Sequence, residues 1–427
     1  MVKEKNNRNL IEELVLIKFD KIKNFINSYG VNIIILFVSF FQTKYFLRIL
    51  GTETFGIYGY VVVIAGYINV FSSELQNYTL LKYLSKEKND NSKIYSKNIF
   101  YRIIISFLLL PIGVYLLLKT TKNFFIILIL FFEIFKTYLP KKILDVEGYR
   151  NIALRVTLTE KIGFIFGLFI LSISLNNQNL NHIILPCFLS LSFYYIYYLK
   201  NFNMNFLFNN LHNFNINLFN KSFVINDLVF IIIPFSYMMQ LGFIRFYAGF
   251  NGLFVELASI NILISLANVG STFINLILRG RIKKLIFDNG LFKKSVLQEL
   301  FFKLILASLI YLLGLTFIGP FLLKFITSDT DIIINPKLLP LTGLIIIMSV
   351  VTDMFNQIAL ISNRYSSLKI YGPVLLGSLI SFLISIFIIN NNLSLFYVIF
   401  GLNIGLFIML LVQIFFFKNT IYKDIYK

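Results

Sequence analysis

The sequence is poor in the residues that build metal and catalytic centres. Cys187 is the only cysteine, which excludes an internal disulfide and a thiolate metal site. His182 and His212 are the only histidines, too few for a histidine-based metal centre. The sequence contains no Walker phosphate loop, so it predicts no ATPase. We therefore expect no metal, no cofactor and no enzymatic activity.

Charged residues are also scarce, at 14% of the chain against about 25% in typical soluble domains. Hydrophobic residues make up 57% of the chain, and the mean hydropathy is +0.78. A soluble protein of this composition would have too little polar surface to face water. The 427 residues are therefore interpreted as a series of membrane spans, each of about 20 apolar residues.

Long apolar runs divide the chain into about twelve candidate spans. The longest polar connection falls midway, so the sequence predicts an all-α integral membrane protein with two lobes of about six helices each. The expected spans are 30–48, 56–80, 99–118, 123–140, 153–175, 181–199, 226–248, 253–278, 299–325, 338–361, 366–389 and 394–417.

These spans define the expected domain organisation. Residues 1–27 form a cytoplasmic amphipathic segment, either a helix lying on the membrane or an ordinary lead-in helix, and no cleavable signal peptide is visible. An N-lobe follows at 28–199, then a cytoplasmic linker at 200–225. A C-lobe occupies 226–417, and a basic cytoplasmic tail ends the chain at 418–427.

The net charge of +19 is arranged for a membrane rather than for nucleic acid. Basic residues cluster between apolar runs instead of forming one binding face. With the N-terminus in the cytoplasm, all but seven of the 39 Lys and Arg residues fall on the inner side, as the positive-inside rule requires. Both termini are therefore predicted to be cytoplasmic. The exceptions are Lys44, Arg48, Lys119, Lys122, Arg245, Lys324 and Lys337.

The two halves share a short internal echo. Phe46-Leu47-Arg48 ends the first span, with Gly51 three residues later. Phe243-Ile244-Arg245 ends the seventh span, with Gly249 four residues later. Because both halves begin on the inner side, the pattern predicts a parallel repeat about an axis along the membrane normal.

The stretch from Phe46 to Tyr58 carries a family resemblance. It contains Arg-x-Leu-Gly-x-x-x-Phe-Gly-x-Tyr over Arg48–Tyr58, which resembles the signature joining the first two helices of Wzx-type polysaccharide flippases. This family belongs to the multidrug/oligosaccharidyl-lipid/polysaccharide exporter (MOP) superfamily. The resemblance implies a MATE-like fold of two six-helix lobes, multi-pass in the bacterial inner (plasma) membrane.

The resemblance also implies the activity and partners. Such proteins translocate undecaprenyl-diphosphate-linked oligosaccharide for O-antigen, lipopolysaccharide or capsule synthesis, by rocking of the lobes about a cationic cavity. Other polysaccharide assembly proteins and membrane lipids are the further expected partners. Arg48 and Arg245 are the predicted substrate-binding residues, since a guanidinium binds phosphate oxygens bidentately. Lys44 lies one turn before Arg48 and would extend the basic stripe. The alternative is that these cations snorkel to lipid headgroups at the rim.

Acidic residues inside the spans are candidates for ion coupling or gating, because buried charges in membranes are costly. Glu133 with Lys136 has the spacing of a self-neutralising pair, and Glu160 is expected to pair in the same way. Asp353 has no basic neighbour and is the candidate for binding H⁺ or Na⁺. Glu256 is expected to pair with Arg245, structurally or as a gate. Glu74 is a further candidate, late in the second helix where family members often have an acid.

Three alternative functions remain open. A multidrug or cation exporter of the same superfamily would favour an acidic cavity. A membrane-embedded polysaccharide polymerase would carry a large outer loop with reacting groups, which is absent from this sequence. A structural scaffold would not need buried charges.

Overall fold

A computed structural model describes residues 30–74, 91–136, 150–174, 180–201, 242–287, 294–361 and 395–417, together with short pieces between 376 and 387. All regular structure in these ranges is helical. The expected segments 1–27 and 418–427 lie outside them, as does the expected linker apart from its first two residues, which belong to a helix.

The described part of the first half forms a helix over Gly30–Leu50 and five further α-helices that pack mainly on one another. Pro111 lies inside one of them, as membrane helices tolerate. The α-helices are α2 (Thr52–Asn69), continued by the π-helix η1 (Val70–Glu74), α4 (Asn91–Thr121), α5 (Ile126–Phe135), α7 (Arg150–Ser174) and α8 (Ile184–Asn201), the last preceded by the 3₁₀ turn η2 (Leu180–Ile183).

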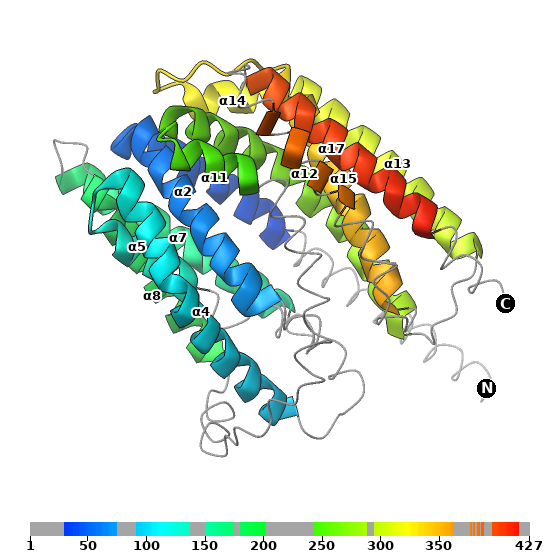
Figure 1. Ribbon diagram of the computed structural model, residues 1–427, viewed down its shortest axis with the longest axis horizontal. Coiled ribbons are helices and arrows are strands. Elements are labelled where there is room, and N and C mark those ends of the chain that lie inside the picture. The colour runs from blue at the N-terminus through cyan, green and yellow to red at the C-terminus, as the bar shows by residue number, and fades with distance from the viewer. Residues whose placement is uncertain are drawn as a thin grey trace, which may run out of the picture.

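The second half forms a separate group of helices (Figure 1). α12 packs on α11, α13 and α15, and α15 packs on α17. The elements are α11 (Phe243–Phe250), α12 (Phe254–Phe287), α13 (Lys294–Phe317), α14 (Gly319–Thr327), α15 (Leu338–Ile361) and α17 (Leu395–Phe417).

The two groups meet where α2 packs on α12 and α11 (Figure 1). We call this contact the seam. The helix before α2 ends near Gly51, and α11 turns into α12 at Gly252; both glycines have positive φ, 81° and 74°. The end of the molecule that carries these two turns is called the turn end. It corresponds to the side predicted to face outward.

Five predicted spans agree with described helices to within three residues: 30–48, 153–175, 181–199, 338–361 and 394–417. The helix ends extend eight or nine residues beyond the predicted 99–118 and 253–278. The spans 226–248 and 366–389 lie largely outside the described residues. One span was wrong in detail. The span 299–325 is two helices, α13 and α14, bent by 48° at Ile318, because Gly319 and Pro320 interrupt the backbone hydrogen bonds there. Arg102, counted among the inner-side basic residues, lies inside α4 with only 2% of its surface exposed.

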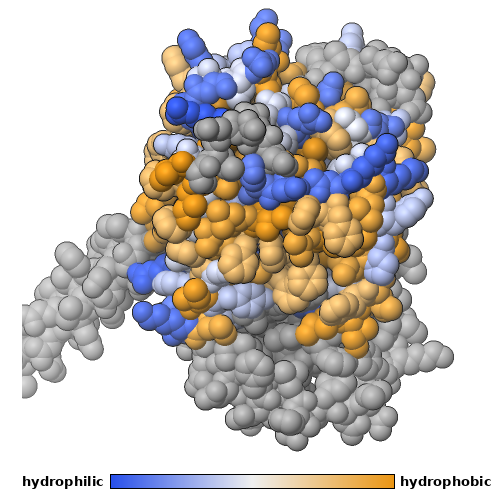
Figure 2. All heavy atoms as spheres, turned by 90° about the vertical axis from the view of Figure 1, so that its left-hand side faces the viewer, coloured by the Kyte–Doolittle hydropathy of each residue, from blue (hydrophilic) through white to orange (hydrophobic). Residues whose placement is uncertain are grey.

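The described residues make a multi-pass membrane protein. Six helices are long and apolar enough to cross a bilayer, and a seventh is added if the bent pair α13–α14 counts as one span. Large apolar side chains remain exposed along them, including Phe321 and Phe107. Figure 2 shows hydrophobic residues gathered across one face, with hydrophilic residues concentrated toward its upper part. Such a surface is stable against lipid tails rather than water.

Candidate functional site

The seam is built from close contacts that only glycine permits. A Cβ on Gly56 would lie 1.9 Å from the backbone oxygen of Phe254, and one on Gly59 would lie 1.9 Å from Nδ2 of Asn261. From the other side, a Cβ on Gly249 would lie 2.2 Å from the ring of Tyr60. The helices of the two halves therefore approach closely near the turn end, as small residues allow in membrane proteins.

Arg245 lies at the seam, and no carboxylate of the described residues pairs with it. It comes from α11, and its Nε is buried with no hydrogen bond in the described structure. Tyr67 of α2 is close enough to interact with it electrostatically. Phe246, the next residue of α11, packs between Tyr60 and Tyr67, with ring centroids 5.9 Å from each.

The depth of this site follows from the helix geometry. Tyr67 lies fifteen residues after Thr52, the first residue of α2, which corresponds to about 22 Å along the helix axis. The hydrocarbon core of a bilayer is about 30 Å thick. Arg245 itself lies seven residues before the turn at Gly252, about 10 Å along the helix axis, and Tyr67 lies deeper than its backbone. The burial of its Nε argues against the snorkelling alternative for Arg245.

Arg48 occupies a different environment. Its side chain is exposed, three residues before the turn at Gly51, and no ion pair to it is found in the described ranges. The structure thus does not bring Arg48 and Arg245 into one interior site. An exposed arginine near a helix end can reach the lipid headgroups, so a substrate role for Arg48 stays a prediction.

The two turn glycines correct the register of the internal echo. Gly252, rather than Gly249, adopts the positive φ seen at Gly51, whereas Gly249 lies within α11. Lys44 precedes Gly51 by seven residues, and Arg245 precedes Gly252 by seven residues. In the folded chain, Lys44 is therefore the positional counterpart of Arg245. The sequence alone aligned Arg48 with Arg245, but Arg48 precedes its turn glycine by three residues and Arg245 precedes its turn glycine by seven.

Lys44 does not contact the Arg245 site. Its Nζ donates a hydrogen bond of 3.1 Å to Oγ of Ser328 and lies 4.0 Å from Oδ2 of Asp329. It also lies 4.0 Å from the ring centroid of Phe325. All three partners belong to α14 or the turn after it, so Lys44 joins the two halves at the turn end.

The predicted pair of Glu133 and Lys136 is confirmed, with Nζ and Oε1 2.6 Å apart. The Tyr58 hydroxyl donates a 3.0 Å hydrogen bond to the same Oε1. Lys136 also lies 3.9 Å from Oε1 of Glu160, so one lysine bridges two carboxylates. These side chains are at most 20% exposed and lie within the first half. The arrangement neutralises charge internally, as a structural cluster would.

The remaining acidic candidates are placed only in part. Glu256 is exposed in the first turn of α12, and no ion pair with Arg245 forms in the part of the chain that the structure describes. Its charge instead suits the N-terminal end of the helix dipole. Asp353 lies on α15 and Glu74 on η1, but their side chains fall outside the described residues.

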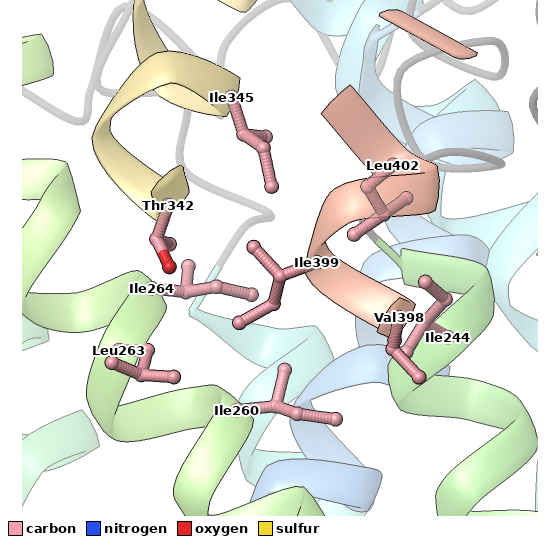
Figure 3. Close-up of a pocket in the computed structure, with 9 residues that line it drawn as sticks. All are labelled: Ile244, Ile260, Leu263, Ile264, Thr342, Ile345, Val398, Ile399 and Leu402. Carbon is pink, nitrogen blue, oxygen red and sulfur yellow. The ribbon is translucent and has the colours of Figure 1, made fainter. Parts of the chain in front are cut away.

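A small cavity between α11, α12, α15 and α17 offers no polar site (Figure 3). Thr342 is its only polar lining residue, and the hydroxyl already donates to the carbonyl of Leu338 at 2.8 Å. A cavity lined in this way stays dry, so it is not a binding site for a hydrated headgroup. The other lining residues are Ile244, Ile260, Leu263, Ile264, Ile345, Val398, Ile399 and Leu402.

Comparison with solved structures shows the fold. The chain is similar to the lipid II flippase MurJ in its inward closed conformation, with a TM-score of 0.63 and 14% identity over 92% of this chain and 87% of that one. It is also similar to an inward-facing multidrug resistance MATE family transporter of the MOP superfamily, with a TM-score of 0.54 and 12% identity over 91% and 96% of the two chains.

These likenesses define a class of fold and no more. No family model and no curated relative matches the sequence. The proteins of similar fold are a flippase and transporters rather than enzymes. The chain thus shares its fold with a lipid II flippase and with MATE transporters.

Proposed function

We propose that this chain is a flippase for an anionic lipid-linked oligosaccharide, in the manner of Wzx-type proteins. Its cargo is an undecaprenyl-diphosphate-linked repeat unit, moved across the bacterial inner membrane for O-antigen or capsular polysaccharide. The two halves would alternate in exposing a shared site to each side. The resemblance of Arg48–Tyr58 and the fold shared with a lipid II flippase support this proposal.

The residue that most strongly supports the proposal is Arg245. A cation inside the membrane is costly unless something compensates its charge. Within the described residues Arg245 has no carboxylate partner. An anionic cargo would supply the missing charge, and a guanidinium suits the paired oxygens of a diphosphate. Tyr67 and Phe246 lie beside it, and aromatic rings of this kind can pack against the faces of sugars.

The energy source belongs to the same proposal. Asp353 remains the candidate for coupling to H⁺ or Na⁺. Glu133 and Glu160 are less suited to that role because Lys136 already compensates them. A proton-motive or sodium-motive transporter needs a carboxylate whose charge changes or is compensated during the cycle.

A second candidate is export of drugs or organic cations, favoured by the fold shared with a multidrug resistance MATE transporter. The two functions require opposite charges at the central site: a positive charge for an anionic lipid-linked cargo and a negative charge for a cationic drug. A cationic drug would be repelled by Arg245 in a low-dielectric environment. That repulsion is the reason we place the flippase first.

Deleting the gene and analysing lipid-linked glycans tests the proposal. We expect single repeat units to accumulate on the lipid carrier in the inner leaflet and surface polysaccharide to disappear. Reintroducing the full chain should restore both. Persisting surface polysaccharide would overturn the proposal, and increased drug sensitivity in the same strain would favour the exporter.

A further inference from the structure

Two lysines of the first half make cation–π contacts with phenylalanine rings of the second half. Lys44, on the helix before α2, lies over Phe325 of α14. Lys119, near the end of α4, lies 4.8 Å from the ring centroid of Phe250 at the end of α11. Cation–π contacts of this kind stabilise by about 0.5–1 kcal/mol at exposed sites and by more when desolvated.

The Lys44 contact is reinforced by neighbouring groups. Asp329 and Ser328 receive its ammonium group on one side. Phe41, almost one turn earlier on the same helix, packs edge-on against Phe325, with centroids 5.8 Å apart and planes at 87°. Lys44 is 20% exposed and Asp329 is 41% exposed, so salt in the solvent weakens this ion pair only in part.

The buried side chain of Asn261 favours separation of the two halves, whereas the lysine contacts favour their association. It lies on α12 in the seam, 6% exposed, and neither its Oδ1 nor its Nδ2 has a hydrogen-bond partner in the described structure. Gly59 faces it from α2, where no side chain could fit. Burying an amide without partners is unfavourable. When α2 and α12 separate, water can reach the amide and that cost is removed.

We propose that Lys44 and Lys119 clamp the turn end shut and that Asn261 opposes them, so that these residues together set how often the turn end opens. A clamp alone would trap the closed state, and an unpaired amide alone would favour separation. When the free energies of the lysine contacts and of the buried amide are similar in size, both the closed and the open state of the turn end are populated, as a cycling transporter requires. The inference rests on the seam itself and holds whatever the cargo is.

Distances across the turn end test this inference directly. Spin labels at Phe124 of the first half and Ile333 of the second half, both exposed, report separation of the halves by pulsed electron resonance in lipid nanodiscs. Cys187, buried and the only cysteine, is replaced by alanine in the labelled protein. Neither labelled residue contributes to the clamp.

The variants shift the populations in opposite directions. Lys44→Gln and Lys119→Gln should each raise the ratio of long to short distances about two- to fivefold. Asn261→Leu, which keeps the number and branching of the side-chain heavy atoms, should lower that ratio about tenfold, because an unpartnered buried amide is replaced by an apolar group. Lys44→Arg keeps the charge and should behave nearly like the parent.

Two outcomes would overturn the inference: unchanged distance distributions in the lysine variants, or Asn261→Leu shifting the ratio toward long distances. The parent protein provides a test that needs no clamp substitution. Raising the salt concentration should increase its long-distance fraction, since the Lys44–Asp329 pair is screened. Because transport is not measured, a failed cargo assignment would leave these results unaffected.

Discussion

Arg245 of α11 and Tyr67 of α2 come from opposite halves of the chain and lie near one another across the seam, where Phe246, the residue after Arg245, packs edge-on against the Tyr67 ring with centroids 5.9 Å apart. Tyr67 lies about 22 Å along α2 from its first residue, and Arg245 lies about 10 Å along α11 from the turn at Gly252. Under the proposed function, a site between the halves would be exposed to one side or the other as the halves move. This relationship makes Arg245 the residue of first interest.

Replacing Arg245 should separate charge from geometry. We expect Arg245→Ala to reduce surface polysaccharide about tenfold or more, because a charge-assisted contact to the cargo is lost. Arg245→Lys should retain part of the activity, since it keeps the charge but loses bidentate binding. Surface polysaccharide in a complemented deletion strain is the measurement.

Arg48→Ala is the matched control for this series. It removes an exposed arginine near the turn end, and we expect a much smaller loss of polysaccharide. Equal losses at Arg48 and Arg245 would instead support the interpretation of both arginines as substrate ligands.

Lys136→Met should destabilise the first half strongly. The substitution leaves Glu133 and Glu160 without the lysine that bridges them. Breaking a buried ion pair costs about 3–5 kcal/mol, so we expect a clear fall in the melting temperature in detergent. The exposed pair Glu299–Lys303, also 2.6 Å apart, supplies the control, because removing Lys303 should change stability by less than about 1 kcal/mol. Similar effects at the two lysines would contradict a structural role for the buried cluster.

Gly56→Ala should force α2 and α12 apart. The new Cβ would meet the backbone oxygen of Phe254, which cannot move aside as a flexible side chain could. We expect a loss of about 1–3 kcal/mol in stability, as for other overpacked interiors. Gly314→Ala on α13 is the control, because no atom lies within 4 Å of its Cβ position. A melting temperature unchanged by Gly56→Ala would show that α2 and α12 can move to accommodate the added methyl group.

Gly252→Ala isolates backbone strain from crowding. The position has a φ of +74° but no atom within 4 Å of an added Cβ. An L-residue in the left-handed region costs about 1–2 kcal/mol. We expect a modest fall in melting temperature, whereas Gly252→Asn should recover part of it because asparagine tolerates this conformation. An alanine variant as stable as the parent would be inconsistent with the turn described here.

The sequence by itself determined that this protein is helical and multi-pass. Long apolar runs with few charges admit little else, because in lipid every backbone polar group must be satisfied within a helix. The pair of Glu133 and Lys136 was also predictable, since i,i+3 spacing places both side chains on one helix face. Gly319 and Pro320 indicate the break at Ile318, but the apolar residues continue across it, and the sequence therefore predicted one continuous span over 299–325.

Only the tertiary structure decided which charges meet. Lys44 and Asp329 are 285 residues apart, and no local spacing predicts their contact. The depth of Arg245 depends on how α11 packs beside α2, and the unpaired amide of Asn261 depends on the glycine that faces it. Helix formation in a membrane is a local matter of hydrogen bonds and apolar surface. The packing of one helix on another depends on shape across long separations in the chain, which a single sequence does not display.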